Sequence, residues 1–80
     1  MRVKNISYTE VVPFIYRASK EHVSLKNSNQ TDWYGVIFED SLVAIAGLLK
    51  TKNGYRIKGI YVVTSMRGQG IGSFLTDHLI

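Results

Sequence analysis

Near its end, the chain carries a short segment with three glycines, placed between an apolar run and an amphipathic run. The segment is Arg67-Gly68-Gln69-Gly70-Ile71-Gly72. Glycine permits positive φ angles and lets a ligand approach the backbone closely. The amides of a helix's first turn have no intrahelical partner, and the helix dipole favours an anion beside them. The segment therefore predicts a strand, a tight turn and a helix N-terminus that hold a phosphate or pyrophosphate. A plain loop-to-helix turn with glycine caps is the alternative.

The glycine spacing excludes two common nucleotide-binding loops. A P-loop needs a Lys followed by Ser or Thr after its glycines, and no such pair follows Gly72. The dinucleotide fingerprint needs G-x-G-x-x-G, whereas here the third glycine comes one residue early and residue 73 is Ser.

Upstream of this segment, the first part of the chain predicts a strand, a helix and a loop. Residues 2–7 alternate loosely and predict a short strand. Thr9 is predicted to cap a helix that ends near residues 19–23, and Pro13 is tolerated if it falls in the first turn. Residues 26–32 are polar and predict a loop.

Three strand-like runs follow, at residues 33–38, 42–49 and 55–63. The near-continuous apolarity of the second run predicts a central strand covered on both faces. Asn53-Gly54 is a strong hairpin signal, and Gly59 indicates a bulge or a close backbone approach. Together the runs predict an α+β fold, which some schemes class as α/β, with an antiparallel sheet of three to four strands.

The last run predicts an amphipathic helix that starts at the glycine segment and continues to Ile80. His78 falls on its apolar stripe and is expected to be packed. Phe74 and Leu79 are expected to be left exposed if little sheet lies beneath them.

Composition limits the ways in which so small a chain gains stability. Eighty residues allow one domain with a small core. The absence of cysteine excludes disulfides and thiolate zinc sites, and two separated histidines form no metal site. No apolar stretch predicts a membrane span or a signal core, so a cytoplasmic protein without a membrane anchor is expected. A ligand or a partner remains as a source of extra stability.

The segment Arg67–Gly72 resembles the acetyl-CoA loop of the GNAT superfamily of N-acetyltransferases. In that family a hydrophobic strand is followed by a short turn and by Arg/Gln-x-x-Gly-x-Gly/Ala at the start of a helix. All the fixed positions are matched here, and Ile60-Tyr61-Val62 matches the strand end. The order of elements also fits. Thr64 and Met66 depart from the pattern, because many members have Pro and an aromatic residue there.

The resemblance implies a partial GNAT-like fold, acetyl-CoA as co-substrate and an amine as acceptor. It implies that backbone groups of Ile60, Tyr61 and Val62 align the acetyl-pantetheine arm, and that an amide near Tyr61 or Val62 polarises the thioester carbonyl. The amides expected to hold the CoA pyrophosphate are those of Arg67, Gly68, Gln69, Gly70, Ile71 and Gly72. No catalytic base is identified, because the third strand-like run lacks Asp and Glu.

The resemblance covers residues 1–80 as a single partial domain. The family's domain continues past this last helix, so the sequence contains one wall of the pantetheine cleft. The strand that ends at residues 60–63 would then be an edge with an apolar end, which invites pairing with another chain. The chain is therefore expected to self-associate, to pair with a complementing chain, or to be a fragment of a longer protein.

All of the net charge of +4 lies in the second half of the chain. Basic and acidic residues balance over residues 1–40, whereas residues 41–80 contain only Asp77 on the acidic side. The basic residues there are Lys50, Lys52, Arg56, Lys58 and Arg67. Their position around the glycine segment is interpreted as attraction for CoA phosphates, and a solvated basic face is the alternative.

Three functions are consistent with these patterns. The first is an acetyl-CoA-dependent N-acetyltransferase, or its cofactor-binding half. The second is a catalytically inactive module that binds CoA or a protein. The third is nucleic-acid binding, with Trp33, Tyr34 and Tyr55 stacking on bases. This third function is disfavoured, because the aromatic residues are spaced like strand core residues and no basic cluster interleaves with them.

Overall fold

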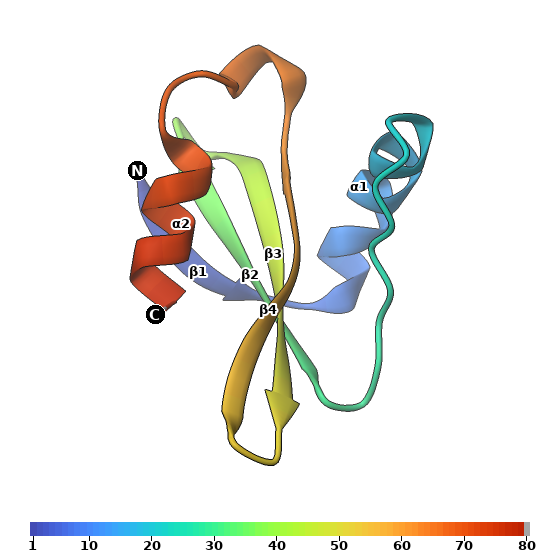
Figure 1. Ribbon diagram of the computed structural model, residues 1–80. Helices are drawn as coiled ribbons and strands as arrows, with labels where there is room; N and C mark the ends of the chain where they lie inside the picture. Colours follow the sequence, from blue (N-terminus) through green and yellow to red (C-terminus); the bar gives the residue numbers. More distant parts are fainter. Residues whose placement is uncertain (80) are drawn as a thin grey trace.

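A four-stranded antiparallel sheet forms the centre of the molecule, with one helix on each face (Figure 1). The computed structural model describes residues 1–79, so the expected continuation of the last helix to Ile80 lies outside the described residues. The sheet order is β1-β2-β3-β4. The elements are β1 (Arg2–Ile6), α1 (Tyr8–Lys20), β2 (Thr31–Phe38), β3 (Ser41–Thr51), β4 (Gly54–Val62), a 3₁₀ turn (Thr64–Met66) and α2 (Ile71–Leu79). The expected α+β class and antiparallel sheet are confirmed.

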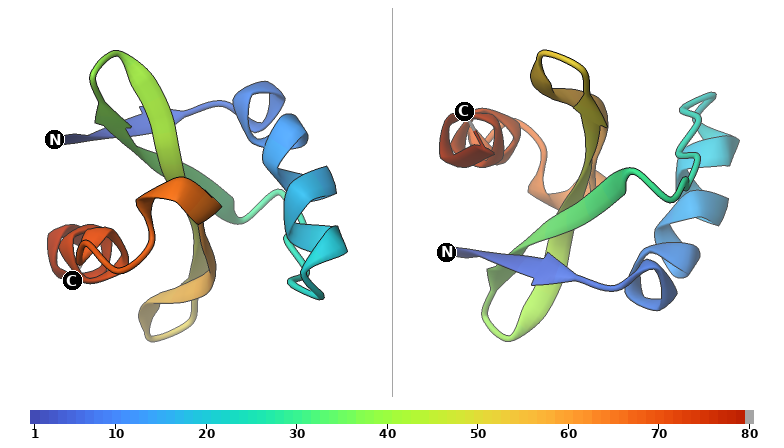
Figure 2. Two further views of the ribbon diagram at one scale, coloured as in Figure 1. Left: turned by 90° about the horizontal axis from the view of Figure 1, so that it is seen from above. Right: turned by 90° about the horizontal axis from the view of Figure 1, so that it is seen from below.

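Strand β3 is the central strand that its apolarity predicted. It pairs with β2 on one side and β4 on the other, and residues 43–47 are all buried. The helices cover opposite faces of the sheet, as the two views in Figure 2 show. Ile45 belongs to the cluster under α1, whereas Ala44 and Ala46 belong to the cluster under α2. Such alternation buries successive side chains of one strand in two different cores.

Two tight turns join the three long strands. In the β2–β3 turn, Glu39 and Asp40 have φ angles of +50° and +63°. Positive φ at both central residues is the type I′ geometry, which matches the twist of a hairpin. The β3–β4 turn consists of Lys52 and Asn53, and Gly54, the first residue of β4, has φ +133°. The second turn agrees with the hairpin signal at Asn53-Gly54.

The last strand carries a bulge beside Gly59, as its glycine indicated. The register passes from Gly47↔Gly59 to Leu48↔Ile57, which leaves Lys58 as the extra residue. A Cβ on Gly59 would lie 3.2 Å from Leu25 Cδ2, so the backbone also approaches the loop after α1 closely. Beyond the bulge, β4 directs its alternate side chains to the two cores.

The start of α1 differs from the prediction. The cap is Ser7 and not Thr9, and the Ser7 amide donates to Glu10 Oε2 at 3.0 Å. A carboxylate three residues after the cap is a stronger helix-start signal than a lone Thr. Pro13 is consequently the sixth residue of the helix rather than part of its first turn. The helix ends at Lys20, within the predicted range.

Candidate functional site

The predicted site begins where β4 leaves the sheet. Residues Ile60, Tyr61 and Val62 pair with Ala46, Ile45 and Ala44 of β3. Tyr61 is buried, with 4% of its surface exposed, and faces the core under α1. Ile60 and Val62 are half-buried and face the core under α2. The strand is thus held from both faces up to its last residue.

After the 3₁₀ turn, the chain passes through two glycines in the left-handed region. Gly68 has φ +81° and Gly70 has φ +75°. A Cβ at either position would meet nothing within 4 Å, so the backbone there borders open space. The third glycine differs: Gly72 lies inside α2, and its Cβ would make an ordinary contact with Val62 Cγ2 at 4.0 Å. Only two of the three glycines are therefore required by the backbone conformation.

Helix α2 presents its N-terminus to this turn. The Phe74 amide donates to the Gly70 carbonyl at 2.9 Å, and this bond starts the helical ladder. The amides of Ile71, Gly72 and Ser73 precede the ladder, and such first-turn amides are free to bind an anion. Ile71 itself is 2% exposed and anchors this end of the helix on the sheet. This buried anchor gives the start of α2, and the turn before it, a fixed position.

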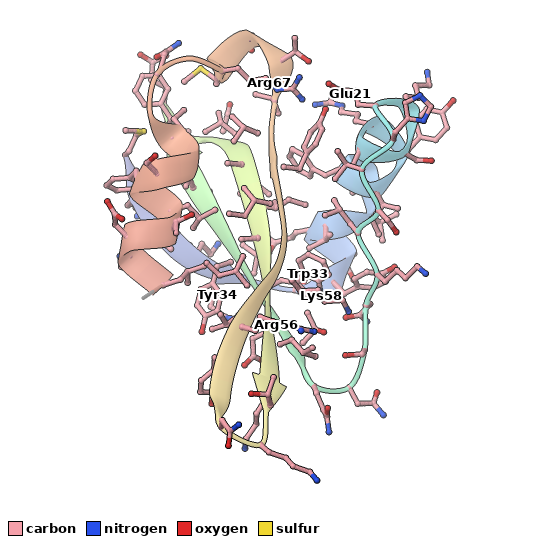
Figure 3. All side chains as sticks on the ribbon, in the orientation of Figure 1. Glu21, Trp33, Tyr34, Arg56, Lys58 and Arg67 are labelled. Carbon is pink, nitrogen blue, oxygen red and sulfur yellow. The ribbon has the colours of Figure 1, made fainter. Side chains whose placement is uncertain are left out.

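The Arg67 side chain is turned toward α1 and away from the glycines (Figure 3). Its Nη1 and Nη2 donate to the two carboxylate oxygens of Glu21 at 2.6 and 2.9 Å. Its Nε donates to the Val62 carbonyl at 3.0 Å. The positive charge that the sequence assigned to the phosphate site is therefore compensated by Glu21.

Glu21 also accepts a hydrogen bond from the Tyr61 hydroxyl at 2.6 Å. The hydrogen bonds from Arg67 and then Tyr61 lower the pKa of Glu21 below its ordinary value. The hydrogen bond to Glu21, together with burial, raises the pKa of Tyr61. Glu21 escaped the sequence analysis because it lies 46 residues from Arg67 and 40 from Tyr61, and no local pattern marks it.

A groove of about 530 Å³ runs beside this network, between the end of α1 and the end of β4. Its walls combine hydroxyl, apolar and charged groups. They are formed by Arg17, Lys20, Glu21, Tyr61, Val63, Thr64 and Ser65. The groove therefore borders the strand end that was predicted to align the acetyl-pantetheine arm.

The other basic residues of the second half lie away from the glycine turn. Lys50 pairs with Tyr55 next to the β3–β4 turn, at the opposite end of β4 from the glycines. The nine residues of β4 separate its ends by roughly 25–30 Å. Figure 3 shows Arg56 and Lys58 toward that far end, and Lys58 Nζ donates to Thr31 Oγ1 at 3.2 Å. The interpretation of a charge concentrated around the turn is therefore wrong.

Two further expectations concern side chains of the cores. Trp33 is 3% exposed and its Nε1 donates to Asn27 Oδ1 at 2.9 Å, so it packs in the core and is not available for stacking on bases. His78 is exposed, contrary to the expected packing, because α2 buries only the narrow stripe of Ile71 and Leu75. Phe74 is 36% exposed, as expected, whereas Leu79 is half-buried and packs against the cluster under α2, contrary to the expected exposure.

The described part of the chain contains neither a metal-ligand cluster nor a membrane-spanning helix. No three His, Cys, Asp or Glu side chains within residues 1–79 come together as a metal-ligand set. Neither helix in that range is long and apolar enough to cross a membrane.

Comparison with known proteins gives one match. Residues 4–80 match the family model described as the acetyltransferase (GNAT) family. No curated protein and no solved structure matches the chain. The match runs through both helices and all of β2, β3 and β4, and it includes the glycine turn. Because it spans nearly the whole sequence, the chain belongs to the GNAT family of acetyltransferases.

Proposed function

We propose that this chain is an acetyl-CoA-dependent N-acetyltransferase domain, or its cofactor-binding half. The observation that carries the proposal is the turn between β4 and α2. There, two glycines with positive φ and open surroundings lead into the first-turn amides of a helix. Family membership makes CoA the natural anion for this turn.

The pyrophosphate of CoA would lie against the backbone amides from Arg67 to Gly72. Successive amides in a turn with αL residues form a concave anion site, and the dipole of α2 adds to it. A side chain on Gly68 or Gly70 would project into the space that the ligand needs. The contribution of Arg67 is through its amide, since its guanidinium is paired with Glu21.

The acetyl-pantetheine arm would continue along the end of β4, beside Ile60, Tyr61 and Val62. In the reaction, the nitrogen of an amine attacks the thioester carbonyl, the C–S bond breaks, CoA leaves as the thiolate and the nitrogen loses a proton. A backbone amide near Tyr61 or Val62 is the proposed donor to the developing oxyanion. Most of the rate then comes from alignment of the two reactants.

Binding is tested by a pair of variants that differ only in charge. Asp and Asn both tolerate the left-handed region and both cap helices, so Gly70→Asp and Gly70→Asn should fold alike. Acetyl-CoA should raise the melting temperature of the wild-type chain. Both substitutions should weaken binding, and Asp should weaken it at least about tenfold more than Asn, because its carboxylate repels the pyrophosphate. Equal affinities of the two variants for acetyl-CoA would show that the pyrophosphate does not bind at this turn.

Turnover separates the enzyme from a module that binds without chemistry. Release of free CoA in the presence of a panel of amines would support N-acetyl transfer. Binding of acetyl-CoA with no release for any amine would leave the inactive binding module as the function. A third outcome, no binding of acetyl-CoA but strongly salt-dependent binding of oligonucleotides, would favour nucleic-acid recognition instead.

A further inference from the structure

Glu21 is the residue on which three elements of the site converge. It follows the last residue of α1, and its carboxylate binds the hydroxyl of Tyr61 on β4 and the guanidinium of Arg67 in the turn. Figure 3 shows Glu21 and Arg67 facing each other between the end of α1 and the chain that leaves β4. We propose that Glu21 is a positioning residue for acetyl-CoA: it holds Arg67 and Tyr61, and through them it sets where the glycine turn lies.

The side chain of Arg67 anchors the start of the turn. It is joined to Glu21 by two hydrogen bonds and to the Val62 carbonyl by a third. A planar guanidinium held at three points has little freedom, and bidentate pairing with a carboxylate fixes its orientation. Because Gly68 follows Arg67 directly, the start of the amide cradle is placed by this one side chain.

The charges around Glu21 indicate holding rather than proton transfer. Arg67 faces it from the turn, the Tyr61 hydroxyl from β4, and Arg17 and Lys20 share the adjoining groove from α1. The hydrogen bonds from Arg67 and Tyr61 lower the pKa of Glu21, so the group is a carboxylate at neutral pH and a weak base. A residue in this state is suited to fix its neighbours and poorly suited to deprotonate an amine.

At the phosphate site, the side chain of Arg67 and the backbone amides of the turn have different roles. Arg67 faces a carboxylate, so its charge is compensated before any ligand arrives. The anion is then bound by backbone amides, whose directions depend on the position of the turn. On this basis, loss of Glu21 should weaken acetyl-CoA binding even though it frees a cation near the phosphates. The inference rests on the proposed function, because it concerns the same turn.

The test compares two identical substitutions at the two ends of α1. Glu21→Gln removes the charge that holds Arg67 and Tyr61, whereas Glu10→Gln removes a carboxylate that binds the Ser7 amide at the far end of the helix. We expect the dissociation constant for acetyl-CoA to rise about tenfold in Glu21→Gln, the loss typical of a charged hydrogen bond. In Glu10→Gln it should change less than about twofold. An unchanged or tighter constant in folded Glu21→Gln would overturn the proposal.

A charge exchange supplies a readout that simple damage to the fold would not produce. Glu21→Arg and Arg67→Glu should each weaken acetyl-CoA binding, and the double variant should regain part of the affinity because the ion pair is restored in reverse. Recovery is expected to be partial, since an arginine at position 21 cannot accept the hydrogen bond of Tyr61. Losses that simply add in the double variant would count against positioning by this pair.

The outcomes separate this inference from the proposed function. If the wild-type chain does not bind acetyl-CoA, the proposed function fails, and the positioning role fails with it. If the wild-type chain binds acetyl-CoA and Glu21→Gln binds equally well, only the positioning role fails. The phenol titration of Tyr61, read as the difference from Tyr61→Phe, shows in the unliganded chain whether Glu21→Gln has released the hydroxyl: its pKa should fall toward the ordinary value.

Discussion

At the scale of single residues, the three glycines of the turn between β4 and α2 differ in backbone conformation. Gly68 and Gly70 hold positive φ angles, which any other L-residue adopts at a cost. Gly72 holds a place in the first turn of α2 with room for a methyl group. The three glycines look alike in the sequence, but the backbone conformation requires glycine only at positions 68 and 70 and tolerates other residues at position 72.

This difference gives a prediction for stability. Gly68→Ala should lower the free energy of unfolding by about 1–2 kcal/mol, because alanine is strained in the left-handed region. Gly72→Ala should raise it by up to about 1 kcal/mol, because alanine favours the helix. Urea denaturation of both variants and the wild type measures the two values. Equal effects would contradict the difference in backbone conformation between the two glycines.

The pKa of Glu21 gives a second prediction at this scale. A carboxyl whose pKa is lowered on folding stabilises the fold above its unfolded pKa, and this contribution is lost as pH falls through the folded pKa. Wild type should therefore melt higher than Glu21→Gln at neutral pH. The difference should shrink below about pH 4 and vanish in stronger acid. Melting curves over that range test it, and a difference that persists in acid would exclude an ion-pair origin.

At the scale of the elements, helix α1 contains a proline in its interior. Pro13 is its sixth residue, so the Thr9 carbonyl receives no helical hydrogen bond from position 13. Ser7 and Glu10 support the start of the helix, and Val11, Phe14 and Ala18 bury its inner face. The helix therefore persists through packing and capping rather than through local propensity.

Removal of the proline should strengthen this helix. Pro13→Ala is expected to raise the free energy of unfolding by about 1–3 kcal/mol, because it restores an amide donor and relieves the ring clash. Val12→Ala, at a neighbouring exposed position, is the control and should gain no more than about 0.7 kcal/mol from propensity. Urea denaturation of the two variants and the wild type measures these changes in the free energy of unfolding. Equal increases in the free energy of unfolding for the two variants would show that Pro13 does not destabilise this helix.

For the molecule as a whole, the two edges of the sheet differ in character. Strand β1 forms one edge and carries Arg2 and Lys4. Strand β4 forms the other edge: it carries Arg56 and Lys58 in its first part and ends in the uncharged run Ile60-Tyr61-Val62. Charged residues protect an edge from pairing with other chains, and apolar residues do not. The uncharged end of β4 is therefore the expected place for a second copy of this chain to bind.

Self-association through β4 is tested by sedimentation and amide hydrogen exchange at two protein concentrations. We expect the sedimentation coefficient to rise with concentration, and amides of Gly54–Val62 to gain protection at the higher concentration. Amides of Arg2–Ile6 serve as the internal control and should not change. A chain that sediments as a monomer at both concentrations, with unchanged exchange at β4, would rule out this association.

The features of this structure that the sequence predicts are those that depend on residues close together in the chain. The buried run of β3, the turn at Gly54, the bulge beside Gly59 and the strand-turn-helix around Gly70 were all predicted, since each depends on neighbouring residues. The cap lies two residues before the predicted Thr9, because Ser7 is followed three residues later by Glu10, which binds its amide. The exposure of His78 was missed because the width of the buried stripe on α2 depends on the sheet beneath it.

By itself, the sequence determined the order of the elements and the glycine turn, because periodicity, turn chemistry and backbone freedom are local properties. It also carried the motif that indicates the acetyltransferase family. Only the tertiary structure decided where the charges lie. Folding brings Glu21 onto Arg67 and Tyr61, and it carries Lys50 to the far end of β4. Electrostatic partners depend on distance in space, and residues separated by 40 or more positions meet only when the sheet and α1 are assembled.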